Sequence, residues 1–203
     1  MSTAQELVLR SVPFLKEVKN RTAGGQLENW LNANYGLGSD LYRDLARIVT
    51  DGVREGWAAN AELDGPKYRL SRIAEPEEAL HYFSVTAVYM NSVEPYRGQY
   101  HQHPYGVLSL IVPLNFGARL MGPNGWSGAG WTAPGPGSHH YPEVMGGALI
   151  ALFYVPAGRI SYDIRPPSEC TCRLALGGAR GEKGHADADT VLVERPAVRN
   201  ARR

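Results

Sequence analysis

Four of the six histidines in this chain stand in two short clusters. His101 and His103 are separated by a single residue, and His139 and His140 are adjacent. Side chains two residues apart on a β-strand point to the same face of the sheet, so His101 and His103 can direct two imidazoles at one point. Imidazole is a common ligand of zinc, iron and other divalent metals. The spacing therefore predicts half of a metal site on a strand.

A catalytic metal site typically uses three protein ligands and keeps a position open for water or substrate. We expect His140 to be the third ligand, because Gly137 allows a tight turn that aims the following strand inward. On an extended segment its neighbour His139 would face the other way. Glu143 is the carboxylate closest in sequence to either cluster. Two roles stay open for it: a fourth metal ligand, or an unligated proton carrier.

The composition is that of an ordinary globular domain, with 203 residues, 43% hydrophobic and 20% charged, and a formal net charge of +1. A net charge so close to zero does not indicate a basic surface that would bind nucleic acid. We interpret the basic cluster Arg199, Arg202 and Arg203 as a solvated tail. No stretch approaches the roughly 20 apolar residues that cross a bilayer, and the N-terminus lacks the order of a signal peptide. Cys170 and Cys172 are interpreted as free thiols. We therefore expect a cytoplasmic protein that acts on a small molecule and binds neither nucleic acid nor membrane.

The first 64 residues have the pattern of a helical extension. Apolar residues recur at helical spacing after a candidate N-cap at Ser39 or Asp40, namely Leu41, Leu45, Ile48, Val49, Val53 and Trp57. Two further helices are expected around Ala4 to Val18 and Gln26 to Asn34. The helices would cap one face of the following domain or mediate a dimer.

Residues 65–165 have the pattern of a β-domain, and residues 166–203 that of a mobile tail with at most one edge strand at Val191 to Val193. Short β-rich segments separated by glycine and proline favour an antiparallel barrel or sandwich over parallel crossovers. The predicted strands are Lys67 to Ile73, Leu80 to Met90, Gly106 to Leu114, Ala118 to Met121, Ala148 to Val155 and Ile160 to Ile164. The fold class is thus mainly β, with N-terminal α-helices.

Both histidine clusters resemble the two motifs of the cupins. The first cupin motif is a glycine, a short spacer and His-x-His, matched here by Gly98, His101 and His103. The glutamate that follows in cupins is missing, and residues 105–107 occupy its region. The second motif is matched by residues 137–140, with prolines at 134 and 136. The resemblance implies a cupin-like antiparallel β-barrel, the double-stranded β-helix, and a divalent metal such as Fe, Mn or Zn.

More narrowly, the chain resembles the 4-hydroxylaminobenzoate lyase family, small cupin-like proteins with a helical N-terminal part. The resemblance extends from about Leu27 to Ile164. It rests on four runs: Tyr-His-Gln-His-Pro-Tyr-Gly106, Met-Gly-Pro-Asn-Gly-Trp126, Pro-Gly-Pro-Gly-Ser-His-His140 and Leu-Phe-Tyr-Val-Pro-Ala-Gly-Arg-Ile-Ser-Tyr162. It implies a lyase that converts 4-hydroxylaminobenzoate to 3,4-dihydroxybenzoate and ammonia in nitroaromatic degradation. It also implies a homodimer, in which a twofold partner would cover an exposed sheet edge.

The family's chemistry implies roles for residues around the clusters. A metal on His101, His103 and His140 would act as a Lewis acid and activate water. Glu143, if it is not a ligand, would carry the proton to the leaving oxygen. Tyr105 and Tyr141 flank the clusters and could donate hydrogen bonds.

The substrate's ring and para-carboxylate imply two more contacts. Trp126 and Trp131 could stack on the ring. The carboxylate calls for a guanidinium, for which Arg72 and Arg119, both on predicted strands, are the candidates.

Other classes of function stay open at this point. One is a metal-dependent cupin dioxygenase acting on a small aromatic or thiol substrate, in which three-histidine iron sites occur. Another is a noncatalytic cupin that binds a small ligand, although such a module usually needs a fused effector domain. A structural protein whose histidines only form hydrogen bonds is disfavoured by their clustering.

Overall fold

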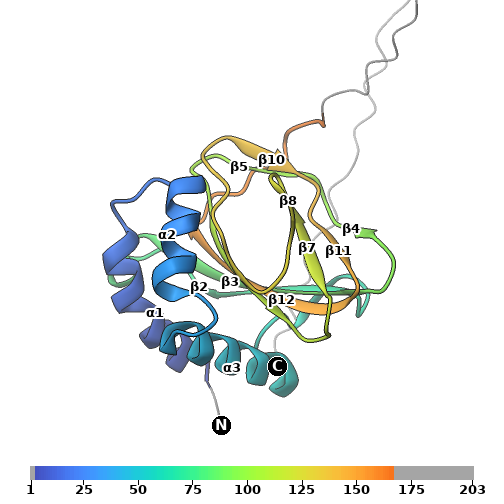
Figure 1. The fold of residues 1–203 in the computed structure, drawn as a ribbon, viewed down its shortest axis with the longest axis horizontal. Coiled ribbons are helices and arrows are strands. Elements are labelled where there is room, and N and C mark those ends of the chain that lie inside the picture. The colour runs from blue at the N-terminus through green and yellow to red at the C-terminus, as the bar shows by residue number, and fades with distance from the viewer. Residues whose placement is uncertain (1–2, 167–203) are drawn as a thin grey trace, which may run out of the picture. The chain divides into compact units, whose positions relative to one another are not determined.

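Three α-helices precede the strands in residues 3–166, the part of the chain that the computed structural model describes (Figure 1). They are α1 (Ala4–Val18), α2 (Gly25–Tyr35) and α3 (Asp40–Glu55), close to the predicted ranges. The Ser39 hydroxyl caps α3 by accepting a hydrogen bond from the Tyr42 amide. None of the described helices is long and apolar enough to cross a membrane.

The third helix ends before Trp57, which the sequence pattern had included in it. Gly56 adopts the left-handed conformation, with a φ of 83°, and ends the helix there. The chain then folds back so that the Trp57 ring lies over Gly52, where a Cβ would come within 2.4 Å of the ring. A glycine is therefore required at position 52, and Trp57 packs beside the helix rather than on its next turn.

Twelve strands follow the helices in the described part, with one short 3₁₀-helix, η1 (Glu78–Leu80). The strands are β1 (Ala61–Asp64), β2 (Tyr68–Ala74), β3 (Phe83–Ser92), β4 (Tyr96–Arg97), β5 (His101–His103), β6 (Leu108–Pro113), β7 (Arg119–Gly122), β8 (Gly125–Ser127), β9 (Gly130–Thr132), β10 (Ser138–His140), β11 (Glu143–Met145) and β12 (Gly147–Pro156).

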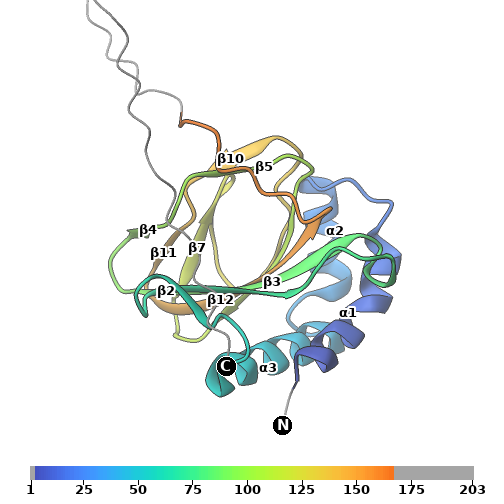
Figure 2. The same ribbon diagram turned by 180° about the vertical axis from the view of Figure 1, so that it is seen from behind.

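These strands form three antiparallel sheets around a common interior (Figures 1 and 2). The largest has the order β1-β2-β3-β12-β6-β9, a second has the order β4-β11-β7-β8, and β10 pairs with β5 alone. The mainly β, cupin-like architecture with N-terminal helices is confirmed. The hydrogen bonding is not continuous between the three sheets, so the barrel is not closed.

The largest sheet is covered on both faces, which explains its long apolar strands. Along β12, Leu152 and Tyr154 belong to the core that the sheet shares with the helices. Ala151 belongs to a second core, which lies between this sheet and β7 and β11. The helices thus cover the outer face, and the barrel interior lies against the inner face (Figure 1).

The helix-facing core makes a clear stability prediction. Leu45 on α3 is fully buried, whereas Leu9 on α1 is 63% exposed. Leu45→Ala should lower the free energy of unfolding by about 2–5 kcal/mol, because it removes buried contacts and leaves a cavity. Leu9→Ala should change it by less than about 0.5 kcal/mol. Chemical denaturation of both variants checks this, and equal losses would contradict the packing.

Three strand predictions need correction. Residues 61–64, assigned to the helical extension, form β1, which pairs with β2 and so belongs to the large sheet. β3 begins at Phe83 rather than at Leu80, because η1 and the left-handed His81 and Tyr82 precede it. The segment Ile160 to Ile164 is no strand, since only Ser161 forms a bridge, to Gln102. The predictions for Cys170, Cys172 and the C-terminal tail lie outside the described residues.

Candidate metal centre

Two short paired strands position the histidines. β5 and β10 run antiparallel, with His101 opposite His140 and His103 opposite Ser138. The loops at one end are tied together, because the amides of Gly106 and Gly137 both donate to the His103 carbonyl, at 3.1 and 2.9 Å. Cross-strand partners share a face, so these strands present three imidazoles on one side.

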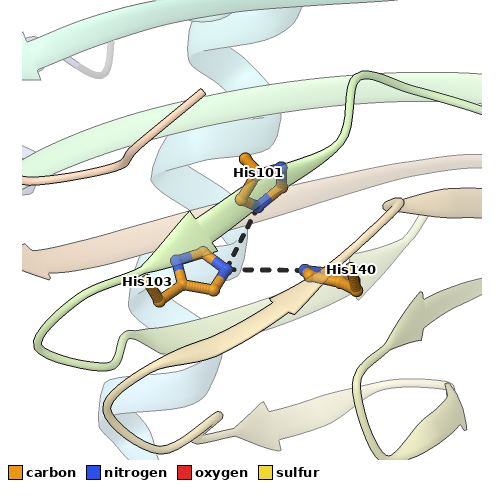
Figure 3. Close-up of side chains that lie close together, drawn as sticks. All are labelled: His101, His103 and His140. Carbon is orange, nitrogen blue, oxygen red and sulfur yellow. Dashed lines mark hydrogen bonds between the residues drawn. The ribbon is translucent and has the colours of Figure 1, made fainter. Parts of the chain in front are cut away.

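The three imidazoles meet through their Nε2 atoms (Figure 3). Nε2 of His103 lies 3.1 Å from Nε2 of His101 and 3.4 Å from Nε2 of His140. His101 and His103 are buried, with 7% and 2% of their surface exposed. These are the three side chains that the sequence predicted to converge, and together they could hold a metal ion.

The protonation states of the three histidines suit metal binding. Nδ1 of His101 lies 3.0 Å from the carbonyl oxygen of Gln99, an acceptor, so Nδ1 carries the proton and Nε2 keeps its lone pair. Burial lowers the pKa of His101, and burial together with the neighbouring imidazoles lowers the pKa of His103 to about 3 and that of His140 to about 4. All three are therefore neutral near pH 7, the form that binds metal.

The spacing of the nitrogens also fits a metal. Ligand nitrogens about 2.0–2.1 Å from a zinc-like ion lie roughly 2.9 Å apart at right angles and roughly 3.4 Å apart at the tetrahedral angle. The His103–His101 and His103–His140 separations, 3.1 and 3.4 Å, fall in this range, and all three ligand atoms lie within 4.8 Å of one another. The chemistry of the donor set, three neutral imidazoles, therefore suits a divalent ion, which would draw His101 and His140 closer together on binding.

His139 points away from this cluster, as the alternation on a strand predicted. It pairs with Gln102 across the strands and is exposed. Its Nδ1 makes a hydrogen bond with the hydroxyl of Tyr100, on the outside of the β5-β10 pair. Of the two adjacent histidines, His140 is therefore the one that joins the cluster.

Glu143 is not brought to the three histidines. Its carboxylate is held by Arg97, with Nη2 at 2.8 Å and Nε at 2.9 Å. Its neighbour Val144 is fully buried in the inner core, so Glu143 stands on the opposite face of β11. The expected fourth ligand is therefore not in the cluster, because the strand breaks at Pro142 and resumes in another sheet.

Neither tyrosine expected at the site faces the cluster. Tyr105 is 56% exposed and borders a cavity beside the loop between α1 and α2. Tyr141 packs against Tyr100, with ring centroids 4.7 Å apart, and the guanidinium of Arg97 lies over its ring. Both belong to the outer surface near the site.

The two arginine candidates occupy different faces. Arg72 on β2 is opposite Thr86 and follows Leu70 on the same face, which is the inner face of the large sheet. Arg119 on β7 is exposed and precedes the inward Leu120, so it stands on the outer side. Of the two, only Arg72 is on the face toward the interior.

Trp131 lies in the helix-facing core rather than at the histidines. Trp131 is 2% exposed and packs against Phe14 of α1, at 4.8 Å between ring centroids, so it belongs to the helix-facing core. Its indole nitrogen donates to the carbonyl of Tyr35. Trp126 on β8 is opposite Met121 and next to Ser127, which pairs with the inward Leu120. Trp131 is thus a core residue, whereas stacking of Trp126 on a substrate ring stays a prediction.

Tyr162, which the sequence analysis did not select, is beside the cluster. Its ring lies 5.8 Å from that of His101. Mutual backbone hydrogen bonds between Ser161 and Gln102, at 2.8 and 2.9 Å, fix the segment that carries it. Tyr162 is 49% exposed, and its partial desolvation raises the pKa of the phenol, a shift that the charge of nearby Arg72 opposes. The run of residues that ends at Tyr162 carries part of the family resemblance, but only the fold shows that its tyrosine lies beside the histidines.

The fold and the site define a small cupin-like protein with a three-histidine candidate metal centre. A family model described as 4-hydroxylaminobenzoate lyase matches residues 9–162. The chain belongs to the 4-hydroxylaminobenzoate lyase family, which is a family of enzymes.

Its relatives carry the same name. The 4-hydroxylaminobenzoate lyase of Nocardioides sp. (strain LMS-CY) is 70% identical over 169 residues, which cover 83% of this chain and 100% of that protein. The 4-hydroxylaminobenzoate lyase of Pseudomonas putida is 54% identical over 173 residues, which cover 81% and 98%.

Solved structures are more distant. A chain from the crystal structures of the DMSP lyases RdDddP and RnDddQII is similar over 80% of this chain and 100% of its own, with 13% identity and a TM-score of 0.37. The DMSP lyase DddQ from Ruegeria pomeroyi DSS-3 is similar over 76% of each chain, with 12% identity and a TM-score of 0.33. Likeness at this level carries no weight for the site.

Proposed function

We propose that this chain converts 4-hydroxylaminobenzoate and one water to 3,4-dihydroxybenzoate and ammonia. The observation that carries the proposal is the convergence of His101, His103 and His140 in a chain that matches the lyase family over residues 9–162. Substrate and water together contain the atoms of the two products. Nitrogen is reduced as the ring is oxidised, so no outside oxidant or reductant is required.

The reaction needs protonation of a leaving oxygen, attack of water on the ring, hydrolysis of a C=N bond and a final proton shift. The N–O bond breaks as its oxygen takes up a proton and leaves as water. A second water adds its oxygen to the ring carbon beside the C–N bond and loses a proton. A third water hydrolyses the resulting C=N bond to C=O and releases ammonia, and transfer of a ring proton to that carbonyl oxygen restores the aromatic system. Two waters enter and one leaves, so the net consumption is one water.

The chain's own residues supply positioning for these steps. His101, His103 and His140 would hold the metal, which when bound supplies Lewis acidity and lowers the pKa of bound water. We assign hydrogen bonding to the hydroxylamino group to Tyr162 and Ser138. The Ser138 hydroxyl is buried, has no partner among the described residues, and shares a face with His103. Tyr105, Tyr141 and Glu143 support the surrounding surface instead.

Arg72 is the proposed partner of the substrate's carboxylate. It is on the inner face of the sheet and near Tyr162. Its Nη1 lies 2.8 Å from Glu75, but the side chains are 38% and 74% exposed, so this ion pair is weak and can give way to a substrate carboxylate. Homodimer formation and a cytoplasmic location stay predictions from the sequence.

Turnover of 4-hydroxylaminobenzoate by the purified protein tests the proposed function. We expect one ammonia and one 3,4-dihydroxybenzoate per substrate consumed, without oxygen uptake. Activity should fall when a chelator removes the metal and return when a divalent ion is added, because three neutral imidazoles hold the ion reversibly. Oxygen uptake on turnover would point to a dioxygenase instead, and a metal-loaded protein that releases no ammonia would refute the lyase.

A further inference from the structure

Phe153 is a partly exposed residue in a strand that is otherwise almost entirely buried. Every residue from 147 to 155 on β12 is buried except Phe153, which is partly exposed. β12 is in the middle of the six-stranded sheet, between β3 and β6, so no sheet edge accounts for this exposure. Solvent must therefore reach Phe153 from one of the two faces of the sheet.

The face in question is the one toward the barrel interior. Phe153 packs against the inner core cluster, whereas its neighbours Leu152 and Tyr154 belong to the helix-facing core. It is opposite Thr86 on β3 and Ser109 on β6. Phe153 is thus the partly exposed aromatic ring on the inner face of this strand.

The strand register surrounds Phe153 with polar side chains. The same cross-strand row runs from Arg72 through Thr86, Phe153 and Ser109 to Thr132. The next row on this face is apolar from β2 to β6 and consists of Leu70, Val88, Ala151 and Ile111. The inner face therefore has a filled apolar row beside a polar row that contains one aromatic ring and one charge.

The spacing of this row suits a benzoate. Neighbouring strands are about 4.8 Å apart, so Arg72, two strands from Phe153, begins roughly 10 Å away. The Arg72 guanidinium is held by Glu75 and the Gly158 carbonyl, and on leaving these partners the long side chain can cover part of that distance toward a carboxylate on a ring at Phe153. Tyr162, near Arg72 and 5.8 Å from His101 between ring centroids, connects this row to the histidine cluster.

We propose that Phe153 packs against the aromatic ring of the substrate and sets the preference for planar aromatic carboxylates. This inference rests on the proposed function for the identity of the substrate, and it assigns to Phe153 the ring contact that the sequence had suggested for Trp126 and Trp131. Offset or edge-to-face packing on an aromatic side chain favours a flat π-face beyond the area it buries.

Binding of two non-reacting probes, benzoate and cyclohexanecarboxylate, tests the proposal on the metal-loaded full chain by calorimetry. They share a charge and nearly a size, but only benzoate has a π-face. The parent should bind benzoate about two- to tenfold more tightly. In Phe153→Leu this ratio should fall to about one, and Phe153→Tyr, which keeps a ring, should retain it.

A folding defect does not change the ratio of the two affinities, because a loss of folded protein reduces the binding of both probes equally. Phe116→Leu is the matched control, because Phe116 is fully exposed in the turn between β6 and β7. Its ratio should equal that of the parent. An unchanged ratio in Phe153→Leu, or a parent ratio near one, overturns the role of Phe153. Neither titration needs turnover, so a protein that forms no ammonia would refute the proposed function separately.

Discussion

Replacing His103 by alanine is expected to remove the bound metal and to lower kcat/KM for 4-hydroxylaminobenzoate by more than about a hundredfold. His103 is the middle member of the cluster, since its Nε2 contacts the Nε2 atoms of both His101 and His140. It is also 2% exposed, so no outside group can take its place. Even partners that only orient a ligand typically cost ten- to a hundredfold when lost, and a ligand itself should cost more.

His139→Ala is the matched control for this prediction. It removes an imidazole from the same strand as His140, but from the exposed face, where it bonds to Tyr100. We expect metal content, measured by mass spectrometry of the purified protein, to stay at the parent's level in His139→Ala and to be lost in His103→Ala. A His103→Ala protein that keeps both metal and ammonia release would show that the cluster is not the catalytic centre.

The sequence predicted the parts of the site that depend on local periodicity. His101 and His103 share a face because they are two apart on one strand, and His140 rather than His139 joins them by the same alternation. The helix at α3 followed from its apolar spacing and its Ser39 cap in the same way. In these places each element is long enough, or close enough to its partner, for its own pattern to determine which face is buried.

The errors arise where that local pattern breaks. Glu143 follows His140 by three residues, but Pro142 separates β10 from β11 and each pairs in a different sheet, so the alternation starts anew. Trp131 stands on a three-residue strand after Gly130, too short to reveal which face is inward. Phe153 lies in a strand that is apolar on both faces, and such a run carries no alternation to distinguish them. Only the register across the sheet shows that Phe153 meets the interior.

Arg72→Ala is expected to raise KM for 4-hydroxylaminobenzoate by about ten- to a hundredfold, because a hydrogen bond to a charged group contributes about 1.5–3 kcal/mol. Arg72→Lys should recover only part of the affinity, since an ammonium cannot bind a carboxylate through two parallel donors. Arg119→Ala, on the exposed outer side of β7, should leave KM unchanged. Steady-state ammonia release measures all three, and an effect of Arg119→Ala with none of Arg72→Ala would reverse the assignment.

Arg72 could also act through the fold, and the substrate itself separates the two roles. Its Nη2 lies 3.4 Å from the carbonyl of Gly158, in the segment that leads to Tyr162, so losing it could loosen that segment. A loosened segment would impair any hydroxylaminoarene, with or without a carboxylate. A lost carboxylate contact would impair 4-hydroxylaminobenzoate and leave phenylhydroxylamine, which lacks the carboxylate, unaffected. We expect the parent to prefer the carboxylated substrate and Arg72→Ala to turn over both alike. An equal fall for both substrates would instead make Arg72 a positioning residue for Tyr162.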